Sequence, residues 1–148
     1  MTVRVRVAST ADADAITAVH LASRAAALPW LPRVHSDEAT RWWVEHVVLA
    51  EHRTWVAVDG EDVVGFASLS PGHLEQLYLD PDRRRQGIGT LLFRQVQQNS
   101  PEGFTFFVFA RNAPARAFYE RHGCRVIAAS DGRDNEEREP DVTYAWIR

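Results

Sequence analysis

The chain has 148 residues, enough for one domain with a sizeable core and too few for two domains of ordinary size. Hydrophobic residues make up 45% and charged residues 25%, which is typical of a soluble globular protein. The net charge of -3 argues against nucleic acid as a partner, and the single cysteine, Cys124, excludes an internal disulfide and fits a reducing cytoplasm. We therefore expect one cytoplasmic domain over residues 1–148.

The first half of the chain alternates strand and helix signals. Val3, Val5 and Val7 alternate with polar residues, which predicts a half-buried strand rather than a signal peptide. The longest apolar run, 106–110, is far shorter than the roughly 20 residues that cross a bilayer, so no membrane contact is expected. The expected elements are a strand over 2–7, a helix over 10–27, a helix after Ser36, and strands over 55–58, 63–69 and 74–79.

The second half continues the pattern. Apolar residues at helical spacing follow Gly87, and the aromatic run 104–110 predicts a central strand covered on both faces. A helix over 113–122, strands over 126–129 and 142–147 and a charged loop over 131–140 complete the chain. The strand over 74–79, the helix after it and the strand from 104 form a βαβ unit with parallel strands, so we expect a mixed α/β fold around one sheet.

A glycine-rich turn follows the strand over 74–79. Residues Arg84-Arg85-Gln86-Gly87-Ile88-Gly89 have the pattern R-x-x-G-x-G and open the next helix. The glycines allow a tight turn and a close approach to a ligand, and the helix start offers unpaired N–H groups and a positive dipole end. The turn therefore suits a diphosphate, although an ordinary strand-to-helix turn would use the same residues. The spacing excludes the usual NAD and ATP motifs.

A second cluster runs from Asn112 to Cys124 and contains Phe118-Tyr119-Glu120. Together with the glycine-rich turn, it closely resembles the GNAT superfamily of acetyl-CoA-dependent N-acetyltransferases. The diphosphate motif of that family, Q/R-x-x-G-x-G/A, is matched at Arg84, Gly87 and Gly89. The family's second motif, N-x-x-A-x-x-F-Y-E-x-x-G-F, is matched at Asn112, Ala115, Phe118, Tyr119, Glu120 and Gly123, with Cys124 in place of the usual aromatic residue.

The resemblance implies a fold and a cosubstrate. The fold would be α/β, with a mixed central sheet of six to seven strands, four helices, and strands four and five parallel and splayed. The cosubstrate would be acetyl-CoA, and no metal is expected. The residues that the resemblance assigns to acetyl-CoA are Leu77, Tyr78 and Leu79, whose backbone would pair with the pantetheine arm; Arg84, Arg85, Gln86, Gly87, Ile88, Gly89 and Thr90 at the diphosphate; and Asn112.

The resemblance also implies direct attack of an amine on the thioester, with Tyr119 as the general acid. A phenol with an ordinary pKa of about 10 is a weaker acid than a thiol at about 8.5, so its proton transfer must be coupled to C–S cleavage. For the base, alternation on the strand predicts that His73, Glu75, Leu77 and Leu79 share one face. We favour Glu75, with His73 or a water molecule as alternatives, and Glu75 could also simply meet solvent.

The acceptor is left open by the sequence. In the family, the first two helices and their connection help to wall the acceptor site; here they carry Trp30, His35, Trp42 and Trp43, which would serve equally well as core residues. Acids in the loop over 131–140 could attract a cationic amine or be merely solvated. The expected partner is a small-molecule or peptide amine, and the family also allows a homodimer. A non-catalytic acyl-CoA-binding regulatory domain of the same fold is the competing prediction.

Overall fold

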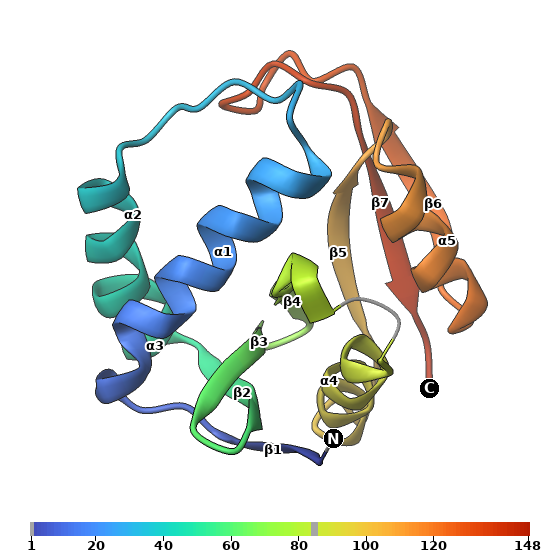
Figure 1. Ribbon diagram of the computed structural model, residues 1–148. Helices are drawn as coiled ribbons and strands as arrows, with labels where there is room; N and C mark the ends of the chain where they lie inside the picture. The colour runs from blue at the N-terminus through green and yellow to red at the C-terminus, as the bar shows by residue number, and fades with distance from the viewer. Residues whose placement is uncertain (1, 84–85) are drawn as a thin grey trace.

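The computed structural model describes residues 2–83 and 86–148 and contains one mixed sheet with helices on both faces (Figure 1). The strands lie in the order β1-β2-β3-β4-β5-β7-β6, and only the β4–β5 pair is parallel. The strands are β1 (Val3–Val7), β2 (Arg53–Asp59), β3 (Asp62–Ser70), β4 (His73–Leu79), β5 (Phe104–Phe109), β6 (Arg125–Ser130) and β7 (Asp141–Trp146).

The helices follow the predicted order. Ser36 caps α2 as expected, because its Oγ accepts a hydrogen bond of 3.1 Å from the Ala39 N–H. A π-helical segment, Val44–Val48, joins α2 to α3 in one helical run. The helices are α1 (Ala13–Ala27), α2 (Asp37–Trp43), α3 (Leu49–Glu51), α4 (Ile88–Gln98) and α5 (Ala113–Arg121). Among the described residues, no helix is long and apolar enough to cross a membrane.

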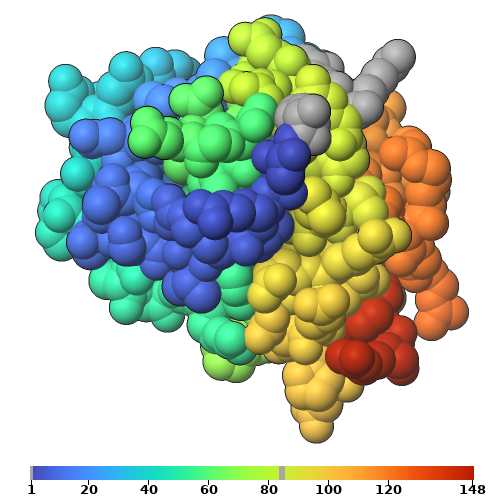
Figure 2. Space-filling model, turned by 60° about the horizontal axis from the view of Figure 1, so that its bottom comes forward, coloured from blue at the N-terminus to red at the C-terminus, as the bar shows by residue number. Residues whose placement is uncertain are grey.

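Two groups of buried side chains cover the two faces of the sheet. On one face, α4 packs Leu92, Phe93 and Val96 against β2, β3 and β5, and α5 adds Tyr119 to the same core. On the other face, α1 and the run from α2 to α3 enclose Phe66 and Val56. Figure 2 shows β1 and α4 side by side on the surface, with the C-terminal residues on the opposite flank of α4.

The parallel strands β4 and β5 separate after a single residue pair. His73 is paired with Thr105, and the Thr105 N–H also donates to the Gly72 carbonyl at 3.0 Å. Beyond that point β4 stays bonded to β3 on one side, whereas β5 follows β7. The predicted splay of strands four and five is thereby confirmed, and it opens the molecule at the carboxyl ends of both strands (Figure 1).

Two expectations about side-chain orientation are wrong. The strand from residue 104 is not covered on both faces, because Phe107 is 65% exposed on the face that α1 and α2 leave open. The prediction that His73, Glu75, Leu77 and Leu79 share one face of the strand is also wrong. The pairing of β4 with β3 shifts between Ser68 and Leu69, so that one extra residue lies in β4 between Leu74 and Gln76.

The consequence of this β-bulge is visible in the packing of β4. Leu74, Leu77 and Leu79 all pack into the core beneath α4, although Leu74 and Leu77 are three positions apart and would face opposite sides of a regular strand. Tyr78 packs into the opposite core, against α1. Glu75 lies beside His73, whose ring contacts the exposed Phe107 at 5.0 Å between centroids. The bulge therefore turns Glu75 to the face opposite Leu77 and Leu79.

Candidate active site

A cleft of about 1070 Å³ lies at the opening between β4 and β5. Its walls come from α1, α2 and the connection between them, the strands β4 and β5, α5 and the loop between β6 and β7. Trp42 and Trp43, the predicted acceptor-wall residues of α2, are part of this lining. Glu75, Leu77, Tyr78, Asn112 and Tyr119, all predicted site residues, line it together. The fold thus brings both predicted catalytic residues and most of the predicted pantetheine-binding residues to one place, whereas Leu79 packs against the core and is absent from the lining.

The predicted diphosphate turn lies at the start of α4, outside the lining of that cleft. Arg84 and Arg85 fall outside the described residues, and Gln86 is exposed just before the helix. Gly87 has φ 78° and ψ 7°, a left-handed conformation that favours glycine. The Leu91 N–H donates to the Gly87 carbonyl, which leaves the N–H groups of Ile88, Gly89 and Thr90 without partners within the helix.

Gly89 brings this helix start close to its neighbours. A Cβ atom there would lie 3.1 Å from Phe118 Cε1 and 3.5 Å from Leu79 Cδ1, so the lack of a side chain permits the packing. The Thr90 side chain is held by His122. The His122 Nδ1–H donates to the Phe118 carbonyl at 2.9 Å, so Nε2 accepts the hydrogen bond of 3.2 Å from the Thr90 hydroxyl. The turn is therefore anchored on α5 and β4.

The edge of β4 that faces the cleft is open. Its other edge pairs Leu77 with Ala67, Tyr78 with Phe66 and Leu79 with Gly65. Toward β5 the described pairing ends at His73. Backbone groups on an unpaired edge need partners, and an extended chain that lies along the edge can provide them.

Asn112 caps α5. Its Oδ1 accepts a hydrogen bond of 3.3 Å from the Ala115 N–H, and Pro114 occupies the first turn of the helix. Among the described residues its Nδ2 amide makes no hydrogen bond, and the residue lines the cleft. The cap thus uses one end of the side chain and leaves a donor for a ligand.

Tyr119 lies at the base of the cleft, packed against Phe93, Phe106 and Tyr144. Burial raises the pKa of its hydroxyl well above the ordinary value, and the nearby Tyr78 hydroxyl adds to the effect. No hydrogen bond to this hydroxyl occurs within the described part of the chain. Tyr119 is therefore a protonated phenol with a free hydrogen-bonding capacity at neutral pH.

Glu75 stands between two imidazoles. Its Oε1 lies 3.7 Å from His73 Nε2, and its Oε2 lies 3.9 Å from His52 Nε2. The carboxylate side chain is 25% exposed and reaches the cleft. Of the two bases considered from the sequence, Glu75 lines the cleft and His73 stands behind it.

His20 is a cleft residue that the sequence analysis missed. It is 6% exposed and contacts Trp43, Phe66 and Tyr78 with ring centroids 5.3, 6.5 and 4.8 Å away. Burial, with a smaller contribution from the charge of Arg24, lowers the pKa of His20 to about 4. The available signal was its position four residues after Ile16, on the buried face of α1.

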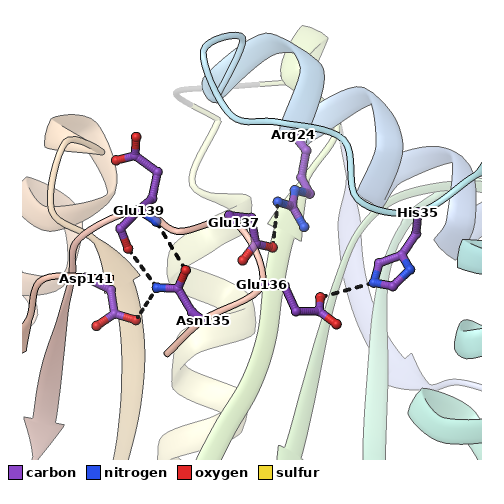
Figure 3. A network of polar contacts seen from close by, with 7 residues as sticks. All are labelled: Arg24, His35, Asn135, Glu136, Glu137, Glu139 and Asp141. Carbon is purple, nitrogen blue, oxygen red and sulfur yellow. Dashed lines mark hydrogen bonds and ion pairs between the residues drawn. The ribbon is translucent and has the colours of Figure 1, made fainter. Parts of the chain in front are cut away.

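The loop over 131–140 closes the far end of the cleft. Figure 3 shows Glu137 directed at Arg24 and Glu136 directed at His35, at distances of 3.4 and 3.0 Å. Asn135 holds the loop from within, because its Nδ2 donates to the Glu139 carbonyl at 2.7 Å. Glu137 is thus tied to α1 and Glu136 to the connection after it. Asp131, Asp134 and Glu136 are nevertheless exposed to solvent, so the expectation of a solvated loop is wrong only for Glu137.

A further contact joins the two sides. The Arg111 guanidinium lies over the Trp30 ring at 3.8 Å and also pairs with Glu139 at 2.8 Å. Trp30 is therefore neither a simple core residue nor a free aromatic group. The described residues contain no group of histidine, cysteine and acidic side chains that could hold a metal ion.

Comparison with known proteins agrees with this geometry. Residues 50–125 match the family model described as "Acetyltransferase (GNAT) domain". The peptidyl-lysine N-acetyltransferase YjaB of Escherichia coli K12 is 35% identical over 100 residues, 67% of each chain. Its Salmonella typhimurium counterpart is 39% identical over 87 residues, which are 58% of this chain and 59% of that protein, so this match spans less than two thirds of its length.

Solved structures share the whole architecture. Apo-form YjaB from Escherichia coli superposes with a TM-score of 0.78 and 30% identity over 99% of both chains. The PaiA N-acetyltransferase of Thermoplasma acidophilum, solved in complex with coenzyme A, superposes with a TM-score of 0.78 over 100% of both chains. The latter is only 17% identical and supports the fold alone.

Proposed function

The chain belongs to the GNAT acetyltransferase family and is an acyltransferase, and from this premise we propose that it transfers the acetyl group of acetyl-CoA to a primary amine. The observation that carries the proposal is the separation of β4 from β5 after one residue pair, next to a left-handed glycine turn that opens α4. An open strand edge and a helix start with free N–H groups lie together there. A pantetheine diphosphate has the matching shape and charge.

The chain's own residues fit this cosubstrate. The N–H groups of Ile88, Gly89 and Thr90 have no partner within the helix and would hold the diphosphate at the left-handed Gly87 turn. The open edge of Leu77 to Leu79 would pair with the pantetheine arm, and the Asn112 Nδ2 would donate to it. Arg84 and Arg85 remain predicted contributors to the diphosphate site.

The bond-forming step needs a neutral amine. A lysine-like amine has a pKa of about 10.4 and is almost wholly protonated at neutral pH, so it must lose a proton before it attacks the thioester carbon. Glu75 is the carboxylate in the cleft that can accept this proton, directly or through water. A backbone N–H of β4 would stabilise the charge that develops on the thioester oxygen, an effect worth about 10²–10³ in rate per donor.

The bond-breaking step needs a proton for the departing thiolate. Tyr119 supplies it in this proposal, because its hydroxyl is protonated at neutral pH and lies at the base of the cleft. The raised pKa makes Tyr119 a weak acid, so its proton moves together with C–S cleavage and not before it.

Transfer is direct, without an acyl-enzyme. Cys124 is the only cysteine, it is buried in the core beneath α4, and it is absent from the cleft lining. Burial raises the pKa of its thiol to about 12, so a thiolate nucleophile does not form there at neutral pH.

The proposed acceptor is a cationic amine, which the charge of the cleft and the names of the relatives support. Four carboxylates line the cleft, those of Glu75, Glu136, Glu137 and Asp141, against two guanidinium groups, those of Arg24 and Arg33. This excess of acids suits a cationic amine. The relatives named peptidyl-lysine N-acetyltransferase support a lysine side chain as the amine.

The proposal is tested by binding and by turnover. Acetyl-CoA at about 100 times its dissociation constant should stabilise the folded chain by about 2.7 kcal/mol, which a thermal melt detects. Thiol release is then measured with lysine peptides, poly-L-lysine and small primary amines. A stabilised protein that releases no CoA with any amine would be an acyl-CoA-binding domain, and a chain that acetyl-CoA does not stabilise would contradict the whole proposal.

Tyr119→Phe tests the acid. It should lower kcat by about 10²-fold or more, in line with general acid catalysis, while the acetyl-CoA dissociation constant stays within about twofold. Phe118→Leu is the matched control, because it changes packing beside Tyr119 and leaves the hydroxyl in place. Unchanged turnover in Tyr119→Phe would remove Tyr119 from the mechanism.

A further inference from the structure

Two histidines lie next to Glu75 and have no part in the acetyl-transfer step described above. Two imidazoles from different parts of the chain face its two oxygens, His73 from the start of β4 and His52 from the link between α3 and β2. Neither histidine lines the cleft, whereas Glu75 does. His52 lines a second, smaller cavity of about 200 Å³. Glu75 thus separates the reaction space from two partly exposed histidines.

The proton balance of the reaction explains why such a group is useful. An ammonium substrate gives up two protons when it becomes an amide. One of them ends on the sulfur of CoA, and the other must leave the protein. A carboxylate in the cleft that accepts this proton must lose it again before the next turnover. A second base next to Glu75, outside the cleft, can take this proton from Glu75 and pass it to solvent.

The surroundings of the two Nδ1 atoms differ, and this difference sets which nitrogen of each ring carries the proton. His73 Nδ1 lies 3.1 Å from the Thr105 hydroxyl, which can accept its N–H, so Nε2 carries the lone pair toward Glu75. His52 Nδ1 is buried with no hydrogen-bond partner. An unpaired buried N–H destabilises a fold, so the proton of a neutral His52 ring sits on Nε2, which faces Glu75 Oε2.

We propose that Glu75, His73 and His52 form a proton-release unit, in which His73 takes the proton from Glu75 and His52 holds the carboxylate in place. The proposal rests on the proposed function, with Glu75 as the base. The proton moves from the amine nitrogen to Glu75, then from the Glu75 carboxyl through one bridging water to His73 Nε2, 3.7 Å away, and finally from the imidazolium to solvent. Thr105 stabilises that imidazolium by accepting its Nδ1–H.

The charged side chain of Arg53, which lies near His52, is engaged by other residues. Arg53 also lines the second cavity, but its guanidinium donates to Asn99 Oδ1 at 2.8 Å and lies over the Trp55 ring. His73 and His52 are the titratable groups that pair with Glu75 within the described residues. The unit can therefore be altered one residue at a time.

The kinetic test uses His73→Gln, His52→Gln and Thr105→Val, with acetyl-CoA and poly-L-lysine as substrates and thiol release as the signal. His73→Gln should lower kcat by about tenfold or more, within the range of general acid–base catalysis, and imidazole added to the buffer should restore part of the rate. His52→Gln and Thr105→Val should displace the pH–rate profile with little change in the KM for acetyl-CoA. His46→Gln is the control, because His46 is exposed and stacks on Trp42.

A second measurement does not depend on activity. The ¹⁵N resonances of His52 and His73 should shift in Glu75→Gln, while those of His46 stay in place. Unmoved resonances would overturn the unit, as would wild-type pH–rate profiles in all three kinetic variants. Loss of turnover in Glu75→Gln with unaffected histidine variants would keep Glu75 as the base and reject its coupling to the histidines.

Discussion

His20 is an imidazole whose charge is set by the folded structure. The folded chain binds a proton at His20 only below about pH 4, whereas an unfolded chain binds one below about pH 6.5. Between these values the unfolded state holds more protons, so acidification favours unfolding. We expect the free energy of unfolding to fall by about 2 kcal/mol between pH 7 and pH 5 because of this one residue.

Urea unfolding of His20→Gln at both pH values measures this contribution. The variant should lose most of the pH dependence, whatever its stability at neutral pH, because glutamine does not titrate. His46→Gln should keep the wild-type slope, since His46 is exposed. A slope that His20→Gln leaves intact would show that other groups cause it.

Asn112 has two separable roles, a helix cap and a donor into the cleft. Asn112→Ala should cost about 1 kcal/mol of stability through loss of the cap and should also weaken acetyl-CoA binding. Asn112→Asp should keep the cap, because an aspartate oxygen accepts from Ala115 equally well, and should lose only the binding. Melting curves with and without acetyl-CoA separate the two effects, and equal binding by Asn112→Asp and wild type would exclude the donor role.

At the scale of the elements, the start of α4 depends on two glycines for different reasons. A Cβ at Gly87 would meet nothing within 4 Å, so Gly87→Ala strains only the left-handed backbone. A Cβ at Gly89 would lie 3.1 Å from Phe118 Cε1, so the Phe118 ring would have to shift by a small amount to make room for it. Gly87→Ala should therefore cost about 1–2 kcal/mol through backbone strain, whereas the cost of Gly89→Ala depends on how far the Phe118 ring resists the shift.

Both variants should bind acetyl-CoA more weakly, since both displace the N–H groups of Ile88 to Thr90. Thermal melts and isothermal titration with acetyl-CoA are carried out on both variants, with Gly123→Ala as the control. Gly123 also has a positive φ and an open surrounding, but it closes α5 and stands apart from the turn. Acetyl-CoA binding that is equal in all three variants would argue against a diphosphate at this turn.

The order and type of the elements were predictable from periodicity, capping residues and glycine or proline breaks. The direction of Glu75 was not, because alternation along β4 assumes a regular strand and the bulge opposite Ser68 and Leu69 reverses it. The exposure of Phe107 was equally hidden, since an aromatic run looks the same whether helices cover one face of a strand or both. Local pattern fixes what an element is, and tertiary neighbours decide which of its faces is used.

At the scale of the whole molecule, contacts between distant segments close the cleft. The partners in the Arg24–Glu137 and His35–Glu136 pairs are 113 and 101 positions apart, so no local sequence motif predicts these two contacts. The Glu137 side chain is only 14% exposed, which separates this pair from ordinary surface pairs. These contacts hold the loop over 131–140 against α1, across the opening between β4 and β5.

Glu137→Gln should release this loop without unfolding the protein. We expect a stability loss of less than about 1 kcal/mol, faster amide hydrogen exchange over residues 131–140 and a higher KM for poly-L-lysine. Asp131→Asn is the matched control, because Asp131 pairs with Arg133 in an exposed contact at 3.4 Å. Exchange rates that rise equally in both variants would assign the effect to lost charge rather than to the contact with Arg24.

The strand order β5-β7-β6 also has a consequence for synthesis on the ribosome. Strands β1 to β4 are bonded in the order β1-β2-β3-β4, so each can pair with its predecessor as it emerges. Strands β5 and β6 must wait for β7, which inserts between them and supplies antiparallel partners to both. During that interval β5 presents Phe104, Phe106 and Val108 without their partners on β7, so we expect incorrect strand pairing to arise at this stage of translation.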